Sequence, residues 1–325
     1  MTYTIRICCN KLIKKIKGLN CLNSETSTNI NEPNDVVFLP NYKDVRLLGI
    51  GGTSTVYKVI EQNTKKLYTR KNVYKGSSAI REVHVLKRLP KNRFFPVYID
   101  MITNDITLSI ITEYINGIEM FEWFDSNYQQ TKKQLPYNIF INVLMEFVQA
   151  IKYLNDSGYS HLDIKLENVI IQTNRVLHET HYNIVLIDYG MAHPYTTELG
   201  KLGCVCGTIG YTPLEIYQGF YTANSDIWSI GVCMWILITG EQPFKHEHSM
   251  RGSTGKSIIK KFVFPNKRHL LCKRRFKINE DLFSLLIEML QVSYKDRISM
   301  DDLLYKLNAI KAKDLITKHV NGYSA

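Results

Sequence analysis

The 325-residue sequence lacks an apolar run long enough to cross a bilayer, which takes about 20 residues in a helix. Its longest apolar run, residues 227–239, is shorter and predicts a buried core helix. The first residues also lack the apolar core of a secretory signal peptide, and Thr2 stands where N-myristoylation requires glycine. We therefore expect an intracellular protein, in the cytoplasm or the nucleus, that is not secreted and has no transmembrane helix.

Cysteine shows no pattern of pairing. The chain has seven cysteines, an odd number, and the close pair Cys204 and Cys206 has no second pair with which to form a zinc site. Together with the missing signal peptide, this pattern predicts free thiols in a reducing compartment.

Acidic residues are outnumbered, with 41 Lys and Arg against 30 Asp and Glu and a net charge of +11. A basic surface suits acidic proteins, anionic membranes or nucleic acid, and it can equally be an ordinary solvated surface. The densest basic stretch, Lys267-Arg268 with Lys273-Arg274-Arg275-Lys277, could dock an acidic partner or nucleic acid, but a solvated loop fits it better. We therefore do not expect a nucleic-acid partner.

Residues 1–40 are predicted to form a flexible, basic tail, because segment 20–34 is rich in Asn, Ser and Thr and cannot bury a core. Residues 5–19 mix Ile and Leu with several lysines, which also fits a short basic amphipathic helix. Acylation of the neighbouring Cys8 and Cys9 would supply a second membrane signal. Membrane contact through this tail therefore stays open as an alternative.

The hydrophobic pattern changes from strand-like to helical near Gly117, which indicates a β-rich part followed by a helical part, with a cleft between two lobes. The expected strands are residues 42–48, 54–60, 67–73, 97–103 and 106–114, with one helix at 77–89. The expected helices of the second part are residues 120–128, 136–157, 225–239, 279–291 and 299–310.

Glycines lie between the first two expected strands, in the run Gly49-Ile50-Gly51-Gly52-Thr53-Ser54-Thr55-Val56. Glycine lets a backbone approach phosphates closely, and no helix follows, so a hairpin loop over phosphates fits better than a dinucleotide site. Lys71 lies on the third strand, where its side chain can point under that loop. Glu82 lies on the expected helix at 77–89, and no other acidic residue lies between it and Lys71. Glu82 is therefore the expected ion-pair partner of Lys71.

The richest stretch is His161-Leu162-Asp163-Ile164-Lys165-Leu166-Glu167-Asn168, which is followed after a second apolar run by Asp188-Tyr189-Gly190. One aspartate can hold a hydroxyl nucleophile, and Lys165 can neutralise a phosphoryl group. Asn168 and Asp188 offer the oxygen ligands that Mg²⁺ prefers. These are the parts that phosphoryl transfer needs, because that reaction depends on positioning and charge stabilisation.

The order and spacing of these motifs resemble the eukaryotic protein kinase family over residues 42–312. The resemblance implies a two-lobed α+β fold, with a small β-rich N-lobe and a larger α-helical C-lobe. We expect a tail at 1–40, the N-lobe at 41–115, the C-lobe at 116–315 and a second tail at 316–325. Segment 207–211 resembles the loop that positions a substrate peptide, and Glu215 resembles the structural glutamate that pairs with a late arginine, here Arg297.

The resemblance also implies ATP as a substrate and Mg²⁺ as a cofactor. Thr112 would be the gatekeeper, the backbone of Glu113 and Ile115 would bind adenine, and Ile170 would lie beneath it. Glu119 falls where a carboxylate often binds the ribose. The implied ATP-contacting residues are Gly49, Ile50, Gly51, Gly52, Thr53, Ser54, Val56, Lys71, Glu82, Thr112, Glu113, Ile115, Glu119 and Ile170.

The implied mechanism makes Asp163 the catalytic base and Lys165 the group that stabilises the γ-phosphate. Asn168 would act in catalysis and, with Asp188, hold the metal. Lys165 and Thr208 are typical of Ser/Thr kinases, so protein hydroxyls are the expected acceptors. Glu119 and Glu167 fall where some relatives bind basic residues before the target, which predicts substrates with basic flanks.

The sequence departs from the family pattern at several points, including Tyr189 in place of Phe and Pro213-Leu214-Glu215 in place of Ala-Pro-Glu. Ser54 replaces the third glycine of the loop, and the interval from Lys71 to Glu82 is short. Leu162 replaces the arginine that in many kinases pairs with a phosphorylated activation loop, and Cys204 stands where the phosphoacceptor usually lies. We therefore expect activity that does not depend on phosphorylation at 204 or its neighbours. A pseudokinase scaffold and a small-molecule kinase remain alternatives, and the oligomeric state stays open.

Overall fold

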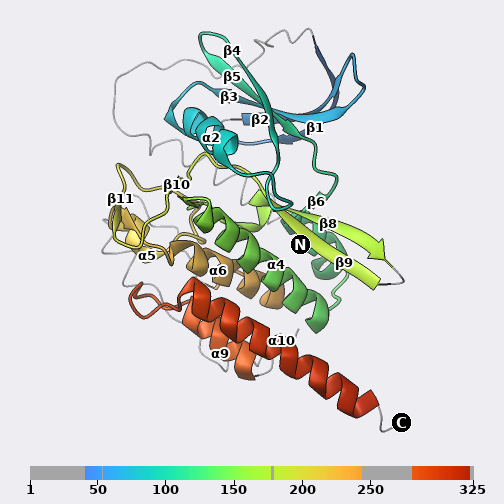
Figure 1. Cartoon of the computed structure of the whole chain (residues 1–325), viewed down its shortest axis with the longest axis vertical. Coiled ribbons are helices and arrows are strands. Elements are labelled where there is room, and N and C mark those ends of the chain that lie inside the picture. Colours follow the sequence, from blue (N-terminus) through green and yellow to red (C-terminus); the bar gives the residue numbers. More distant parts are fainter. Residues whose placement is uncertain (1–40, 53, 177–178, 244–279, 323–325) are drawn as a thin grey trace. The chain divides into compact units, whose positions relative to one another are not determined.

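The computed structural model describes residues 41–52, 54–176, 179–243 and 280–322 (Figure 1). Thr53 of the glycine loop and the predicted acylation sites Cys8 and Cys9 lie outside these residues. The chain divides into two compact units, residues 1–83 with 97–115, and residues 84–96 with 116–325.

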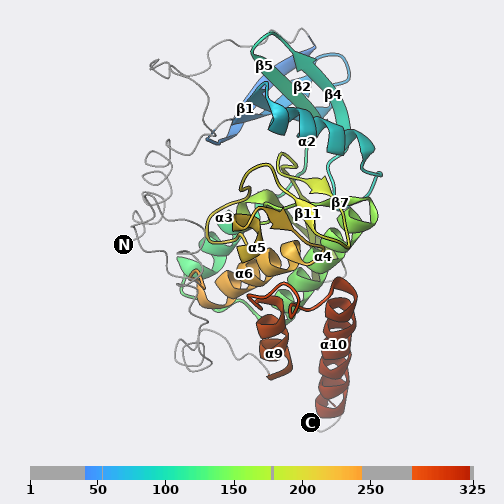
Figure 2. The same ribbon diagram turned by 90° about the vertical axis from the view of Figure 1, so that its left-hand side faces the viewer.

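The first unit contains a five-stranded antiparallel sheet in the order β1-β2-β3-β5-β4. Val59, Leu108, Ile110 and Ile111 are buried in it. Helix α2 follows β3 and lies beside this sheet in Figures 1 and 2. The strands are β1 (Tyr42–Ile50), β2 (Ser54–Glu61), β3 (Leu67–Tyr74), β4 (Tyr98–Thr103) and β5 (Thr107–Glu113), and α2 is Ser77–Arg88.

The second unit is mainly helical and centres on α6 (Ser225–Thr239), all fifteen residues of which are buried. Helix α4 contacts α6 and α10, and α9 contacts α6 and α10, as Figures 1 and 2 show. The other helices are α3 (Met120–Phe124), α4 (Tyr137–Asp156), α5 (Leu214–Tyr217), α9 (Glu280–Met289), α10 (Met300–Gly322) and the 3₁₀ turn η2 (Leu166–Asn168).

Short strands place the functional loops of this unit. A three-stranded sheet has the order β6-β8-β9, formed by β6 (Ile118–Glu119), β8 (Val169–Val176) and β9 (Glu179–Leu186). Two further pairs are β7 (Tyr159–Ser160) with β10 (His193–Pro194), and β11 (Gly200–Lys201) with β12 (Phe220–Tyr221). The β-rich unit and the helical unit confirm the predicted α+β architecture.

The predicted helix at 120–128 is wrong in one respect, because α3 ends at Phe124 and a π-helical turn, η1 (Asp125–Gln129), follows. The Asn127 carboxamide donates a hydrogen bond to the Trp123 carbonyl at 2.7 Å, and this carbonyl would otherwise accept the backbone N–H of residue 127. Such side-chain competition is typical of asparagine within a helix. Helix α10 also continues to Gly322, beyond the predicted 299–310.

A buried ion pair joins α5 to the chain just before α10, as the sequence predicts. The side chains of Arg297 and Glu215 are 0% and 1% exposed, and their atoms Nη1 and Oε1 are 2.6 Å apart. Ser225 also donates to Glu215 at 2.8 Å, and Arg297 donates to the carbonyl of Asn224 at 3.0 Å. Removal of one partner from such a pair typically costs about 3–5 kcal/mol, so this contact fixes α5 firmly.

Among the described residues, none of the helices is both long enough and apolar enough to traverse a bilayer.

Candidate active site

The loop that carries Asp163 is held by a carboxylate from the first turn of α6. Asp226 is buried, and its two oxygens accept the backbone N–H groups of His161 at 2.7 Å and Leu162 at 2.8 Å. Burial raises the pKa of Asp226, whereas His161 and the two N–H groups oppose that rise. Leu162 adopts a left-handed φ of 61°, which costs free energy in a non-glycine residue and persists because these bonds hold it.

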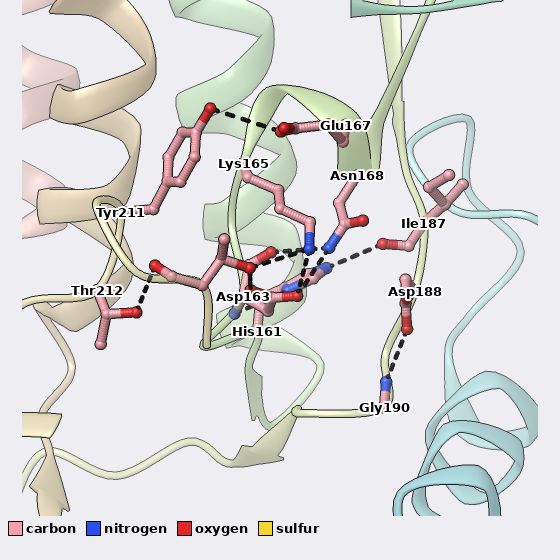
Figure 3. A network of polar contacts seen from close by, with 11 residues as sticks. His161, Asp163, Lys165, Glu167, Asn168, Ile187, Asp188, Gly190, Tyr211 and Thr212 are labelled. Carbon is pink, nitrogen blue, oxygen red and sulfur yellow. Dashed lines mark hydrogen bonds and ion pairs between the residues drawn. The ribbon is translucent and has the colours of Figure 1, made fainter. Parts of the chain in front are cut away.

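Beyond this bend, the side chains of Asp163, Lys165 and Thr208 form a closed polar triangle, of which Figure 3 labels Asp163 and Lys165. Lys165 Nζ donates to Asp163 Oδ2 and to Thr208 Oγ1, both at 3.0 Å. Thr208 Oγ1 in turn donates to Asp163 Oδ1 at 2.6 Å. A half-buried carboxylate therefore lies beside a cation and a hydroxyl, which is an arrangement able to orient a second hydroxyl and accept its proton.

Asn168 holds the other side of Asp163. Its Nδ2 donates to the Asp163 carbonyl at 2.9 Å and to Oδ2 at 3.2 Å, which leaves its own carbonyl oxygen directed away from Asp163 (Figure 3). The β8–β9 register pairs Val169 with Leu186, and the Ile187 N–H donates to the Asn168 backbone carbonyl at 3.0 Å. The hairpin thus places Asp188, which directly follows Ile187, beside the backbone of Asn168.

Asp188 has a left-handed φ of 66°, and its Oδ1 accepts the Gly190 N–H at 3.3 Å. A carboxylate and a carboxamide oxygen are hard donors that suit Mg²⁺, which usually takes one or two protein ligands together with phosphate oxygens and water. Asn168 and Asp188 therefore fit the predicted metal site.

The residues beneath this site form a satisfied polar network. His161 is fully buried, and its Nε2 lies 3.2 Å from the Ile187 carbonyl, while its Nδ1 accepts the Asp163 N–H at 3.3 Å. The buried hydroxyl of Tyr189 donates to the Leu186 carbonyl at 2.8 Å. Tyrosine is therefore accommodated here without an unpaired hydroxyl.

Glu167 lies on η2 beside the segment that carries Thr208. Its Oε2 is 3.5 Å from the Tyr211 hydroxyl (Figure 3). Burial raises the pKa of Glu167 above the usual carboxyl value, although Lys165 and hydrogen bonds oppose the rise. The second predicted acid, Glu119, pairs with Ile170 between β6 and β8, so these two predicted site residues are neighbours.

The first unit contains the predicted phosphate lysine. Lys71 Nζ contacts both carboxylate oxygens of Glu82, at 2.9 and 2.8 Å, and the two side chains are 17% and 7% exposed. This ion pair confirms the predicted partner despite the short interval. Lys71 pairs with Val56 on β2 and with Ile110 on β5, which fixes it in the sheet.

The glycine loop forms a tight turn in which the Gly51 N–H donates to the Ser54 carbonyl at 2.7 Å. A Cβ on Gly51 would lie 2.9 Å from Ser54 Oγ, a contact that rotation of the Ser54 side chain would relieve. Thr112 pairs with Thr69, and the Glu113 N–H donates to the Val97 carbonyl at 2.9 Å. The backbone N–H of Glu113 is therefore already bonded within the first unit.

The predicted site residues are distributed over the two units. The first unit carries Gly49, Ile50, Gly51, Gly52, Ser54, Val56, Lys71, Glu82, Thr112, Glu113 and Ile115, and the second carries Glu119, Asp163, Lys165, Asn168, Ile170 and Asp188.

Sequence reasoning missed the bonds that Asp226 makes to residues 161–168, the predicted catalytic loop. A signal was present, because an acidic residue at the start of an otherwise apolar helix must find polar partners when the helix is buried. Tyr211 as a neighbour of Glu167 carried no comparable signal.

The chain is similar to known protein kinases. The protein kinase domain family matches residues 42–307. Calcium-dependent protein kinase 5 of Plasmodium falciparum is 26% identical over 286 residues, covering 85% of this chain and 46% of the relative. Two kinases of Schizosaccharomyces pombe are also similar. Serine/threonine-protein kinase cds1 is 24% identical over 283 residues, covering 81% and 57%, and meiosis-specific serine/threonine-protein kinase mek1 is 28% identical over 217 residues, covering 61% and 46%.

The chain spans about half the length of these relatives. The family match covers most of the chain, and the β-rich and helical units are those of the two-lobed kinase fold. The chain therefore belongs to the protein kinase domain family.

Proposed function

We propose that this chain is an active Ser/Thr protein kinase that transfers the γ-phosphate of ATP to protein hydroxyls. The observation that carries this proposal is the triangle of Asp163, Lys165 and Thr208, which joins a base, a cation and the substrate-side segment within 3.0 Å of one another. Two of the similar proteins, cds1 and mek1, are named serine/threonine-protein kinases.

In the proposed reaction, Asp163 orients the substrate hydroxyl and accepts its proton as the oxygen bonds to the γ-phosphorus. The bond between that phosphorus and the β–γ bridging oxygen breaks, and ADP leaves. Lys165 offsets the charge of the transferring group. Lys71, held by Glu82, would bind the α- and β-phosphates. Asn168 and Asp188 would hold Mg²⁺, which neutralises phosphate charge when bound.

We further propose that activity does not require phosphorylation of the segment before Thr208. Leu162 is buried against Cys206, Ile216 and Tyr221 in an apolar cluster. An apolar side chain cannot form the charge-assisted bonds with which an arginine binds phosphate. Cys204 is exposed and has no hydroxyl to phosphorylate.

A preference for basic residues before the target hydroxyl is proposed on Glu167 and Glu119. Both side chains are half-buried, and Glu167 lies beside Tyr211 in the same segment as Thr208. A carboxylate in such surroundings gains more from a cation than one in open solvent, because water screens it less.

Replacing Asp163 with alanine should abolish transfer of radiolabelled phosphate from ATP to a generic protein and to the enzyme itself. Loss of the base costs on the order of 10²–10⁴-fold. Asp156→Ala, which removes an exposed carboxylate paired with Lys152, serves as the control and should keep the wild-type rate. Absence of transfer by the wild type as well as by Asp163→Ala would contradict catalysis and support a scaffold.

Enzyme treated with phosphatase should keep its activity within about twofold. The reason is that Leu162, unlike an arginine at this position, cannot bind a phosphate group. Mass spectrometry before and after treatment would verify that phosphate has been removed. The proposal is wrong if the stripped enzyme is inactive and recovers on phosphorylation of Thr196, Thr197 or Thr208.

Glu167→Gln should raise the KM for a peptide with upstream arginine by about tenfold or more, and leave the KM of a neutral peptide unchanged. The carboxylate is ionised only above its raised pKa, so the wild-type KM for the basic peptide should rise as pH falls from neutral towards that pKa. The Gln variant should lack this rise. Equal KM changes for both peptides, or a preference for acidic flanks on peptide arrays, would contradict the assignment.

A further inference from the structure

An apolar cluster lies between the catalytic loop and the segment that carries Thr208. We call it the Tyr221 cluster; it consists of Leu162, Cys206, Ile216 and Tyr221, which are all buried, with Met191 and Leu202 packed against them. Its members come from the catalytic loop, from segment 191–208, from α5 and from β12. The cluster therefore packs together parts of the chain that lie far apart in the sequence.

Tyr221 makes the most varied contacts in this cluster. Its hydroxyl donates to the Pro194 carbonyl at 2.7 Å, and its ring lies 5.5 Å from that of His193. Its backbone pairs with Gly200 between β11 and β12. A Cβ on Gly200 would lie 2.1 Å from the Tyr221 ring, so the ring packs directly on the glycine backbone. One side chain thus holds two separate points of segment 191–202.

The cluster is connected by backbone to the polar triangle at two points. Leu162 directly precedes Asp163, and Cys206 is separated from Thr208 by Gly207 alone. Gly207 has a φ of 89°, and a Cβ there would lie 2.8 Å from the Leu162 carbonyl oxygen. The two backbones therefore touch beside the cluster, and Thr208 then reaches Asp163 at 2.6 Å.

We propose that Tyr221 is a positioning residue for phosphoryl transfer. It holds segment 191–208 in the place from which Thr208 bonds to Asp163 and Lys165, and it does so through packing and one neutral hydrogen bond rather than through a phosphate. This assignment rests on the proposed kinase function, and it names the contact that orders the segment. Buried aromatic packing of this kind does not depend on a modifying enzyme or on ionic strength.

A matched pair of glycine variants tests the proposal. Gly200→Ala places a methyl group into the Tyr221 ring, whereas Gly203→Ala, in the same segment, adds one where no atom lies within 4 Å. Gly200→Ala should lower kcat at least about tenfold with an unchanged KM for ATP, because a small misplacement of catalytic groups costs up to about 100-fold. Gly203→Ala should keep the wild-type kcat.

Rescue separates positioning from general damage. Tyr221→Leu removes the ring that Gly200→Ala displaces, so the double variant should be no less active than Tyr221→Leu alone. Tyr221→Phe keeps the ring and should lose less activity than Tyr221→Leu. Equal kcat values for wild type and Gly200→Ala, or additive losses in the double variant, would overturn the proposal while leaving the kinase function intact.

Amide hydrogen exchange tests the positioning role of Tyr221 without a measurement of phosphate transfer. In Gly200→Ala, exchange should become faster in residues 191–208 while α4 and α6 stay protected, and Gly203→Ala should match the wild type. This result is expected even if the wild type transfers no phosphate, which would refute the proposed function alone. Unchanged exchange in residues 191–208 would refute the role of Tyr221.

Discussion

The carboxylate of Asp226 is the constraint on which the candidate active site depends. It accepts two successive backbone N–H groups and so fixes the bend at His161 and Leu162. Asp163 follows this bend directly, and its carboxylate can face Lys165 and Thr208 only because the bend is held. A carboxylate is suited to this task because both oxygens accept and neither donates.

Helix α6 supplies three polar anchors from its first turns, one bound to the catalytic loop and two bound to the chain between Tyr211 and Glu215. Ser225 donates to Glu215, Asp226 accepts from the catalytic loop, and the Ser229 hydroxyl donates to the Tyr211 carbonyl at 2.9 Å. The helix is otherwise apolar and buried, so it cannot shift without breaking the core. One rigid helix therefore holds both the catalytic loop and the chain between Tyr211 and Glu215.

Two kinds of contact then complete the geometry. The buried Glu215–Arg297 pair fixes the chain at Glu215, and the Tyr221 cluster fixes segment 191–208, which precedes it. In this chain the cluster includes Leu162, where many kinases use arginine. The same segment can thus be ordered by burial of apolar surface, which needs no modification to form.

Local patterns were sufficient to predict most of the fold. Alternation and helical spacing located the strands of the first unit and α4, α6 and α9, because each of these elements buries one face or all of its surface. Ordered motifs also predicted the Lys71–Glu82 and Glu215–Arg297 pairs. The π-helical turn after α3 escaped prediction, because it depends on a single asparagine bonding to Trp123.

The contacts that organise the site were harder to predict. Leu162 and Tyr221 are far apart in sequence and show no periodic relation, so nothing in the chain marks them as neighbours. Asp226 was recognised as part of a core helix, but the two N–H groups that it accepts belong to a loop with no regular pattern. The position of Asp226 in a buried helix indicates that it needs polar partners, but the identity of those partners depends on the tertiary fold.

Substitution of Asp226 with asparagine tests most directly whether Asp226 positions the catalytic loop. The carboxamide keeps the shape but replaces one acceptor with a donor, so one of the two N–H groups of His161 and Leu162 loses its partner. We expect Asp226→Asn to lower kcat about 100-fold and to speed amide exchange at His161 and Leu162, while Asp301→Asn, in the first turn of α10, behaves as the wild type. A wild-type kcat with unchanged exchange in Asp226→Asn would contradict this role of Asp226.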